Sequence, residues 1–244
     1  MRKGPSGLAD WPRPFVFRGA HLDGRTVHSG EQFSFGLNLF DLRQPSLAYL
    51  VQAFAELAHE GLGPGRGRAD LIEVAQSDGV GEFVRKIYHG VSTAVRDLDP
   101  PLTLSLLPPD EPWERIRVRF VTPTELKAGQ RITSRPDFAV LAARVRDRLS
   151  TLRSLYAAGP LQLDFGAFTE RAKRVSMTRC EIEQVEVRRK SSRTGQVHSI
   201  GGFVGTADYE GELEEFVPYL KAAYWTGVGR QTVWGKGQLA VERL

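Results

Sequence analysis

Hydrophobic residues occupy every second position between residues 33 and 39 and then change to a helical spacing. The alternation is typical of a strand with one buried face. The helical spacing runs from residue 47 to residue 58, begins after Pro45-Ser46, and ends at Gly61, a residue type that often terminates helices. We therefore predict a strand that leads into a helix packed against it.

Short strands are predicted for most of the remaining first half, at residues 15–17, 69–74, 83–88 and 102–106. A weakly marked second helix is expected before the last of them. The segment 108–112 then contains three prolines, and proline cannot donate a ladder hydrogen bond inside a sheet. We expect the chain to divide there into an N-terminal domain, residues 1–109, and a C-terminal domain, residues 110–244.

The second half begins with a strand at residues 115–120, in which hydrophobic residues face inward and three arginines face outward. A long helix follows Pro136-Asp137. Its hydrophobic residues form one stripe, and its arginines are expected to lie on a solvated face.

A hairpin over residues 175–189 and 197–209 comes next, with a bulge expected between Ile182 and Val185 because these two residues are out of phase. A helix with Pro218 in its first turn and a closing strand complete the half. Each half thus has the order strand, helix, two strands, helix and strand, which is ferredoxin-like. The fold expected from this order is α+β, and it is compatible with two tandem ferredoxin-like (RRM-like) domains and a C-terminal glycine-rich loop.

Composition indicates a soluble protein that stays in the cytoplasm. The chain has one cysteine, which excludes an internal disulfide framework and a multi-cysteine zinc site. No run of eighteen apolar residues occurs, so no membrane partner is expected. The net charge of +4 is compatible with nucleic acid but does not by itself indicate it.

The segment 227–237 combines glycine with positive charge. Its glycines and cations are Gly227, Gly229, Arg230, Gly235, Lys236 and Gly237. Glycine permits positive φ and close approach to the backbone, so successive N–H groups can line an anion site. Five residues separate Gly229 from Gly235 where a nucleotide P-loop has four, which excludes that motif. The sequence predicts a phosphate-binding loop, with a tight turn that simply needs glycine as the alternative.

Two further basic clusters are predicted to contact RNA. The tip of the hairpin carries Arg188, Arg189, Lys190 and Arg193, and a second glycine-rich loop, residues 61–68, carries Arg66 and Arg68. A basic hairpin and a cationic loop are suited to gripping the phosphates of an RNA stem, which fixes position without reading sequence. A charged tip that only improves solubility is the alternative.

Three motifs near the end of the chain carry a resemblance to a known family. They are GG-x-x-G from Gly201, Y-x-G-x-L-x-x-F-x-P-x-L from Tyr209 and G-x-G-R-x-x-x-x-G-x-G from Gly227. With looser similarity at residues 30–40 and 120–127, the chain resembles the CRISPR-associated RAMP endoribonucleases over most of its length. The resemblance implies the same fold and cleavage of precursor CRISPR RNA within its repeats. It also implies CRISPR repeat RNA and other CRISPR-associated effector subunits as partners, and a monomer or a homodimer.

RNA supplies its own nucleophile, the 2′-hydroxyl, so a cutting enzyme needs a base, an acid and cations, and we expect no metal ion or other cofactor. Some members of the family carry a catalytic histidine at the end of the first helix, with a tyrosine before it and a basic residue after it. The resemblance therefore implies that His59, Tyr49 and Arg66 are catalytic. Tyr49 and His59 are ten residues apart, so the helix would have to break for both to reach one phosphate.

The other histidines are alternatives, because imidazole titrates near neutrality. His28 is the second choice, and the weaker candidates are His21, His89 and His198. Three functions remain open at this point: a metal-independent endoribonuclease, a non-catalytic RNA-binding subunit of a CRISPR effector, and a protein that binds a phosphate ligand or nucleotide at the glycine-rich loop.

Overall fold

The computed structural model describes residues 11–43, 46–63, 65–79, 81–90, 95, 98–157, 159–186, 188–190, 197–199 and 201–244. The chain forms two compact units. Met1–Phe40 with Ser105–Leu244 make up the larger unit, and Asp41–Leu104 make up the smaller one. Residues 1–40 are therefore grouped with the C-terminal part by compactness, while a domain boundary at residue 109 stays a prediction.

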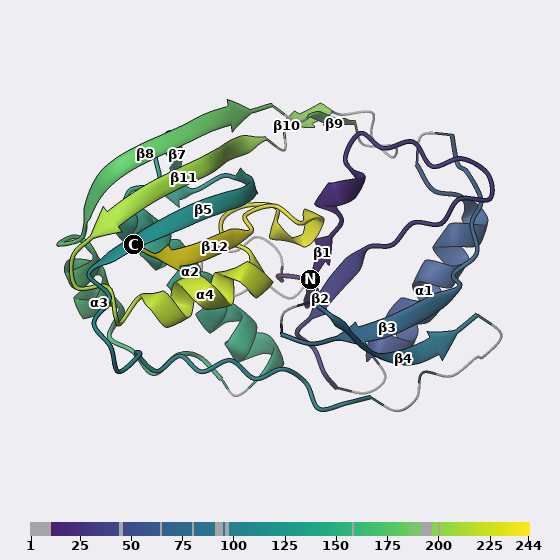
Figure 1. Ribbon diagram of the computed structural model, residues 1–244, viewed down its shortest axis with the longest axis horizontal. Coiled ribbons are helices and arrows are strands. Elements are labelled where there is room, and N and C mark those ends of the chain that lie inside the picture. Colours follow the sequence, from purple (N-terminus) through teal and green to yellow (C-terminus); the bar gives the residue numbers. More distant parts are fainter. Residues whose placement is uncertain are drawn as a thin grey trace. The chain divides into compact units, whose positions relative to one another are not determined.

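A four-stranded antiparallel sheet with the order β12-β5-β11-β8 forms the centre of the larger unit (Figure 1). Its strands are β5 Arg115–Thr124, β8 Ser176–Val185, β11 Gly202–Glu210 and β12 Leu239–Arg243. The helix α2, Phe138–Tyr156, lies between β5 and β8 in the chain, and α4, Val217–Thr226, lies between β11 and β12. This β-α-β-β-α-β order is ferredoxin-like, as predicted for the C-terminal half.

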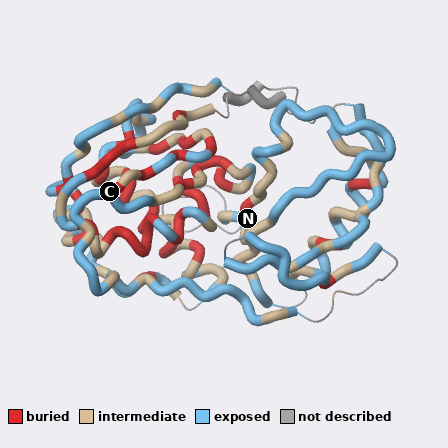
Figure 2. Tube along the Cα trace, viewed as in Figure 1, coloured by how far each residue is buried: buried red, intermediate tan, exposed pale blue. Residues whose placement is uncertain are grey.

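The core of the larger unit lies between this sheet and its helices, where most of the buried residues of the chain gather (Figure 2). The inward residues of β5, Ile116, Val118 and Phe120, are at most 1% exposed. The ring of Phe138 on α2 meets the ring of Phe216 edge to face, with centroids 5.2 Å apart. Such aromatic pairs stabilise a core beyond the area they bury.

A third helix of this unit, α3 at Phe165–Ala172, was not predicted from the sequence. The carboxylate of Asp164 caps its first turn and accepts a hydrogen bond from the N–H of Ala167 at 3.0 Å. Phe168 is fully buried against Phe216, with ring centroids 4.8 Å apart. The helix therefore completes the aromatic core.

The N-terminal strands belong to the larger unit as a separate pair. They are β1, Phe15–Arg18, and β2, Gly36–Leu39, and they are antiparallel, with the short 3-10 helix η1, Ala20–Leu22, after β1. The strand β2 is shorter than the predicted 33–39. The side-chain amide of Asn38 donates to the carbonyl of Trp225 at 2.8 Å, so this pair is tied to the end of α4.

The predicted hairpin over residues 175–209 is divided. Beyond β8 and before β11, the strands β9, Arg188–Lys190, and β10, Val197–Ser199, form a separate antiparallel pair. The bulge expected between Ile182 and Val185 is wrong, because the pairing with β11 is regular there and shifts instead between Arg179 and Met177. Val185 is the last residue of the edge strand β8, so its being out of phase with Ile182 reflects the end of the strand.

The smaller unit contains one α-helix and one strand pair among its described residues. The helix α1, Ser46–Glu60, agrees with the prediction, and β3, Glu73–Ser77, pairs antiparallel with β4, Phe83–His89. The weakly marked second helix is not found in the described part of this unit.

The strand predicted at residues 102–106 is wrong, since these residues form no ladder. Pro100 and Pro101 precede them, and proline has no N–H to donate. Leu102 and Leu104 are 53% and 42% exposed, so the leucine alternation does not mark a buried face here. A small hairpin of the larger unit, β6 Lys127–Ala128 with β7 Arg131–Ile132, was likewise not predicted.

Candidate functional site

The first candidate site is the carboxyl end of α1, where the loop after the helix folds back on itself. Leu62 and Gly67 exchange two backbone hydrogen bonds, of 2.8 and 3.0 Å. Gly61 has a φ of 110°, and a Cβ atom there would lie 2.5 Å from the carbonyl oxygen of Arg66. Glycine is therefore required at this position for the loop to close.

The closed loop brings Arg66 close to the residue that follows His59. The Nη2 group of Arg66 donates to the carbonyl oxygen of Glu60 at 3.0 Å, which satisfies an open acceptor at the negative end of the helix. The side chain of His59 is 70% exposed, and its Nδ1 atom lies 3.8 Å from a carboxylate oxygen of Asp70. A titratable imidazole and a fixed cation thus share one helix end, as predicted.

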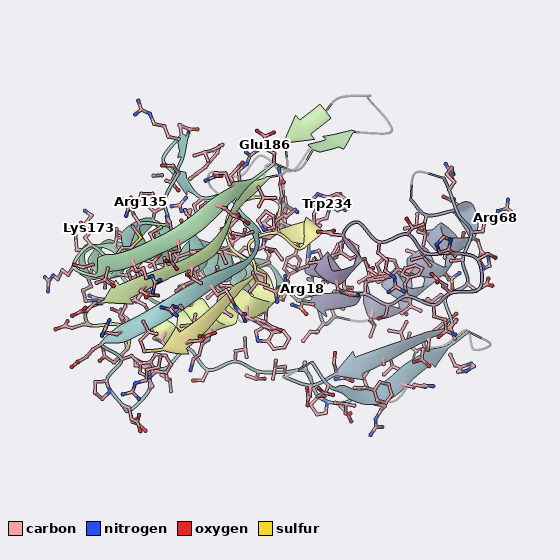
Figure 3. All side chains as sticks on the ribbon, turned by 45° about the horizontal axis from the view of Figure 1, so that its top comes forward. Arg18, Arg68, Arg135, Lys173, Glu186 and Trp234 are labelled. Atoms are coloured by element: carbon pink, nitrogen blue, oxygen red, sulfur yellow. The ribbon has the colours of Figure 1, made fainter. Side chains whose placement is uncertain are left out.

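Tyr49 is not brought to this helix end. The helix α1 runs without a break from Ser46 to Glu60, so Tyr49 lies about 15 Å from His59 along the axis. The helix break that a shared phosphate would need is absent, although Tyr49 itself is 70% exposed. Arg68, one residue beyond the closed loop, is exposed and labelled in Figure 3.

The other histidines have different surroundings. His28 is exposed, and its backbone N–H donates to a carboxylate oxygen of Glu31 at 3.0 Å. The Nε2 atom of His21 lies 2.9 Å from the carbonyl oxygen of Ser34. His89 ends β4 in an exposed position, and His198 lies opposite Arg189 in the pairing of β9 with β10.

The second candidate site is the glycine-rich loop 227–237 of the larger unit, which encloses the 3-10 helix η2, Thr232–Trp234. The loop packs tightly against its own backbone and against the end of β5. A Cβ atom at Gly229 would overlap the carbonyl oxygen of Glu125, and one at Gly237 would overlap that of Val228. Both glycines also have positive φ, so close backbone packing explains why glycine is needed there.

This packing uses most of the N–H groups that were predicted to line an anion site. The N–H groups of Gly227, Val228, Arg230, Gly235 and Gly237 donate to the carbonyls of Ala223, Gly237, Glu125, Thr232 and Pro123, respectively. Each donor is already satisfied inside the protein. A phosphate cradle cannot use these five N–H groups, and anion binding by the rest of the loop stays a prediction.

The two cations of the loop differ in environment. The guanidinium of Arg230 forms an ion pair with the carboxylate of Glu125, and its side chain is still 47% exposed. Lys236 is 9% exposed and forms no ion pair with any described residue. Arg230 is therefore the more accessible of the two cations.

The basic hairpin tip is described only in part. Arg188, Arg189 and Lys190 form β9, where they pair with β10, and the structure gives their backbone. Arg193 lies outside the described residues. RNA binding by these residues stays a prediction.

The arginine face of β5 is largely neutralised by its neighbours. Arg117 donates two hydrogen bonds to the carboxylate of Asp208, at 2.7 and 2.8 Å, and these bonds lower the pKa of Asp208 below its usual value. Arg115 lies 3.8 Å from a carboxylate oxygen of Glu210. A face that is cationic in the sequence of β5 alone is thus balanced by β11.

Two partly buried arginines at the end of α4, directly before the glycine-rich loop, were not identified as candidates from the sequence, and one of them, Arg148, was expected on the solvated face of α2. Arg18 donates to the carbonyls of Tyr224 and Trp225, the second at 3.0 Å, and Arg148 of α2 donates to that of Thr226 at 3.4 Å. Burial lowers the pKa of each guanidinium to about 10. These arginines cap the negative end of α4, directly before the glycine-rich loop, and Figure 3 labels Arg18.

The solvated arginine face predicted for α2 is also wrong at Arg146. This residue is 6% exposed, donates to the carbonyl of Phe165 at 2.8 Å and lies over the ring of Phe165 at 4.2 Å from its centroid. The unpredicted helix α3 covers it, which explains the difference.

Two further classes of site were searched for in the described part of the chain. No three histidine, cysteine, aspartate or glutamate side chains lie close enough together there to hold a metal ion. None of the helices described is long and apolar enough to cross a bilayer.

Several solved structures are similar to this chain. A Cas6 (TTHB231) product complex is 19% identical, has a TM-score of 0.54, and aligns over 95% of this chain and 83% of that chain. A Cas6 (TTHA0078) product complex is 18% identical, has a TM-score of 0.48, and aligns over 94% and 85% of the two chains. Thermus thermophilus Cas6 (TTHB231) is 20% identical, with a TM-score of 0.41, and aligns over 54% of this chain and 55% of its own. The first of these confirms the predicted α+β fold with two tandem ferredoxin-like domains.

Comparisons of sequence give matches to two family models. No curated protein matches the chain. A family model described as an N-terminal domain matches residues 2–100. A second model, described as CRISPR-associated endoribonuclease Cas6, matches residues 118–239, which is half of the chain and includes all three motifs of the C-terminal part. The predicted resemblance is confirmed, and the chain belongs to the family of CRISPR-associated endoribonuclease Cas6.

Proposed function

We propose that this Cas6 family member is a metal-independent endoribonuclease that cleaves precursor CRISPR RNA within its repeats. The 2′-hydroxyl attacks the adjacent phosphorus, and the bond from oxygen 2′ to phosphorus forms as the bond to the leaving 5′ oxygen breaks. A base accepts the proton of the 2′-hydroxyl, and an acid donates a proton to the 5′ oxygen. The products are a 2′,3′-cyclic phosphate and a 5′-hydroxyl.

The presence of His59 and Arg66 at the same helix end carries this proposal. His59 acts as the general base or the general acid, because an exposed imidazole can exchange protons with substrate and water. Arg66 stabilises the charge that develops on the phosphorane oxygens, and Arg68 adds a second cation. Arginine supplies this charge without taking part in proton transfer.

Tyr49 has a more limited role in this proposal. Its distance from His59 along α1 places it away from the reacting phosphate, so we assign it to a neighbouring part of the RNA. Its hydroxyl and exposed ring are suited to a phosphate or a base there.

Residues of both units are proposed to bind the RNA, and Arg68 lies in the smaller unit. In the larger unit they are Arg188, Arg189, Lys190 and Arg193 of the basic hairpin and Arg230 and Lys236 of the glycine-rich loop, whose shape Gly227, Gly229, Gly235 and Gly237 maintain. Their charges act on the phosphate backbone of the repeat RNA. Other CRISPR-associated effector subunits, and a second copy of the chain, are further proposed partners.

The experiment compares His59→Ala with His89→Ala and His28→Ala on a labelled repeat RNA. General acid–base catalysis contributes about 10²- to 10⁴-fold, so His59→Ala should slow cleavage by that factor while RNA affinity stays within about twofold. His89→Ala is the matched control, an exposed histidine of the same unit. Unchanged cleavage by His59→Ala, or a comparable loss in the His28→Ala variant alone, contradicts the assignment of His59.

Arg66 is tested by replacing it with lysine and with alanine. If Arg66 supplies charge to the phosphorane, Arg66→Lys should retain more cleavage than Arg66→Ala. Both variants lose the guanidinium that donates to the carbonyl oxygen of Glu60 at the end of α1, so circular dichroism must show that α1 remains folded. Equal cleavage rates for Arg66→Ala and the wild type contradict the role. If the wild type and all variants bind the repeat RNA tightly but leave it uncut, the protein is instead a non-catalytic RNA-binding subunit.

A further inference from the structure

Trp234 lies at the middle of the glycine-rich loop, at the end of η2, and half of its surface, 50%, is exposed. Its ring stacks nearly parallel on Phe17 of β1, with centroids 6.4 Å apart and an interplanar angle of 16°. The ring of Phe17 also lies against the ring of Phe35, with centroids 6.0 Å apart, and Phe35 is 38% exposed. We call Phe17, Phe35 and Trp234 the aromatic platform; Figure 3 labels Trp234.

The backbone holds Trp234 in place from both sides. Gln231 before η2 and Gly235 after it both have left-handed backbone conformations, with φ values of 60° and 81°. The carbonyl of Gly235 accepts a hydrogen bond from the hydroxyl of Thr122 at 2.8 Å, and a Cβ atom at Gly235 would lie 2.8 Å from the carbonyl oxygen of Phe17. The loop is therefore fixed against β1 and β5, and little conformational entropy is lost when a ligand stacks on the indole.

Half of the Trp234 surface is exposed although the loop is fixed in place and Phe17 packs on the indole ring. In the sequence of the same loop, Arg230 precedes the tryptophan and keeps 47% of its side chain exposed, while Lys236 follows it and is 9% exposed. An exposed ring on a loop that also carries an exposed cation is a combination by which proteins hold single-stranded nucleic acid, with the base on the ring and the backbone near the charge.

We propose that Trp234 is a stacking platform for one unpaired base of the RNA, and that the glycine-rich loop serves to position this ring. The proposal rests on the RNA-processing function proposed above. It commits to an unpaired base because the faces of paired bases are covered by their neighbours in the stem. It also gives the loop a role that does not depend on the N–H groups bonded within the protein.

The test combines protein variants with RNA variants. Wild type, Trp234→Ala and Trp234→Phe are titrated with a repeat RNA made uncleavable by a 2′-deoxy substitution, and with copies carrying an abasic site at each unpaired position in turn. Stacking on an aromatic side chain corresponds to about 5- to 150-fold in affinity, so Trp234→Ala should weaken binding by a factor in that range and Trp234→Phe by less. Phe83→Ala, at an aromatic residue that is 58% exposed on β4, is the control.

One abasic position should weaken binding to the wild type by a similar factor and cause no further loss in Trp234→Ala, because both changes remove the same contact. In the folded wild type, RNA binding should also quench tryptophan fluorescence, and Trp234→Phe should lose this quenching. Equal affinity of Trp234→Ala and wild type, or losses that add at every abasic position, overturn the proposal and leave a protein or a second copy of the chain as the ligand of the platform. A wild type that binds no repeat RNA overturns the proposed function as well.

Discussion

Replacing Gly237 with alanine tests how the glycine-rich loop is built. Gly237 has a φ of +74°, and an added Cβ atom would overlap the carbonyl oxygen of Val228 and lie 2.8 Å from its nitrogen. These are backbone atoms, so they cannot rotate away. The N–H of Val228 donates to the carbonyl of Gly237 at 2.9 Å, and the N–H of Gly237 donates to that of Pro123 at 3.1 Å.

The cost follows from these contacts. A non-glycine residue in the left-handed region costs about 1–2 kcal/mol. Separating the two chain segments breaks two backbone hydrogen bonds, each of about 1 kcal/mol. We therefore expect Gly237→Ala to lower the free energy of unfolding by about 3–4 kcal/mol.

Gly129→Ala is the matched control. Gly129 has a φ of +59°, and nothing lies within 4 Å of an added Cβ atom, so only the conformational cost of about 1–2 kcal/mol applies. The reduced entropy of the unfolded chain is the same in both variants and cancels in the comparison. Urea titrations followed by circular dichroism give both values. If Gly237→Ala is no less stable than Gly129→Ala, the close approach to Val228 is wrong, and the loop N–H groups are open to an anion after all.

Three other substitutions test the larger unit, the first two by the same titration and the third by thermal unfolding at several pH values. Tyr209→Phe removes the donor to the carbonyl of Pro136, at 2.6 Å in the core, and should cost about 1–3 kcal/mol; an unchanged stability contradicts this bond. Phe216→Ala, at a residue 1% exposed, should cost about 3–5 kcal/mol, and a loss below 1 kcal/mol contradicts its packing. Asp208→Asn removes a carboxylate whose pKa is lowered by Arg117. The ion pair of Asp208 with Arg117 stabilises the fold above pH 3.8, and this stabilisation is lost as the pH falls further. The Tm of the variant should therefore approach that of the wild type at low pH. A Tm difference that does not change with pH contradicts the ion pair.

Local patterns predicted those elements whose stability depends on one buried stripe. The helix α1 was placed from its hydrophobic spacing and from Gly61, and β5 from its alternation. The helix α4 begins with Pro218 in its first turn, as expected from the fixed φ of proline. In each case the signal lies within the element or directly beside it.

The errors arise where contacts with distant parts of the chain determine whether a segment forms a strand or whether a side chain is buried. The leucines at 102–106 alternate like a strand, but no neighbouring strand pairs with them. The arginine on α2 at residue 146 is buried because α3 covers it, and α3 was missed although Asp164 is a good cap. Sequence alone gives neither contact.

In the candidate site, too, contacts that are local in sequence were predictable and contacts between distant residues were not. The grouping of His59 with Arg66 was predictable, since a short glycine loop joins them. Two N–H groups of the glycine-rich loop, those of Arg230 and Gly237, could not be paired from the sequence because their acceptors, the carbonyls of Glu125 and Pro123, lie about a hundred residues earlier. The stack of Trp234 on Phe17 joins residues even farther apart in the sequence.

Cleavage of a labelled CRISPR repeat RNA by the purified protein in EDTA, beside a copy with a 2′-deoxy at the cut position, tests the central claim most directly. The account predicts that the RNA is cut to a 2′,3′-cyclic phosphate and a 5′-hydroxyl, and that the deoxy copy is bound but spared, because it lacks the nucleophile. Cutting of the deoxy copy, or failure to cut either RNA, would contradict a metal-independent endoribonuclease that uses the 2′-hydroxyl.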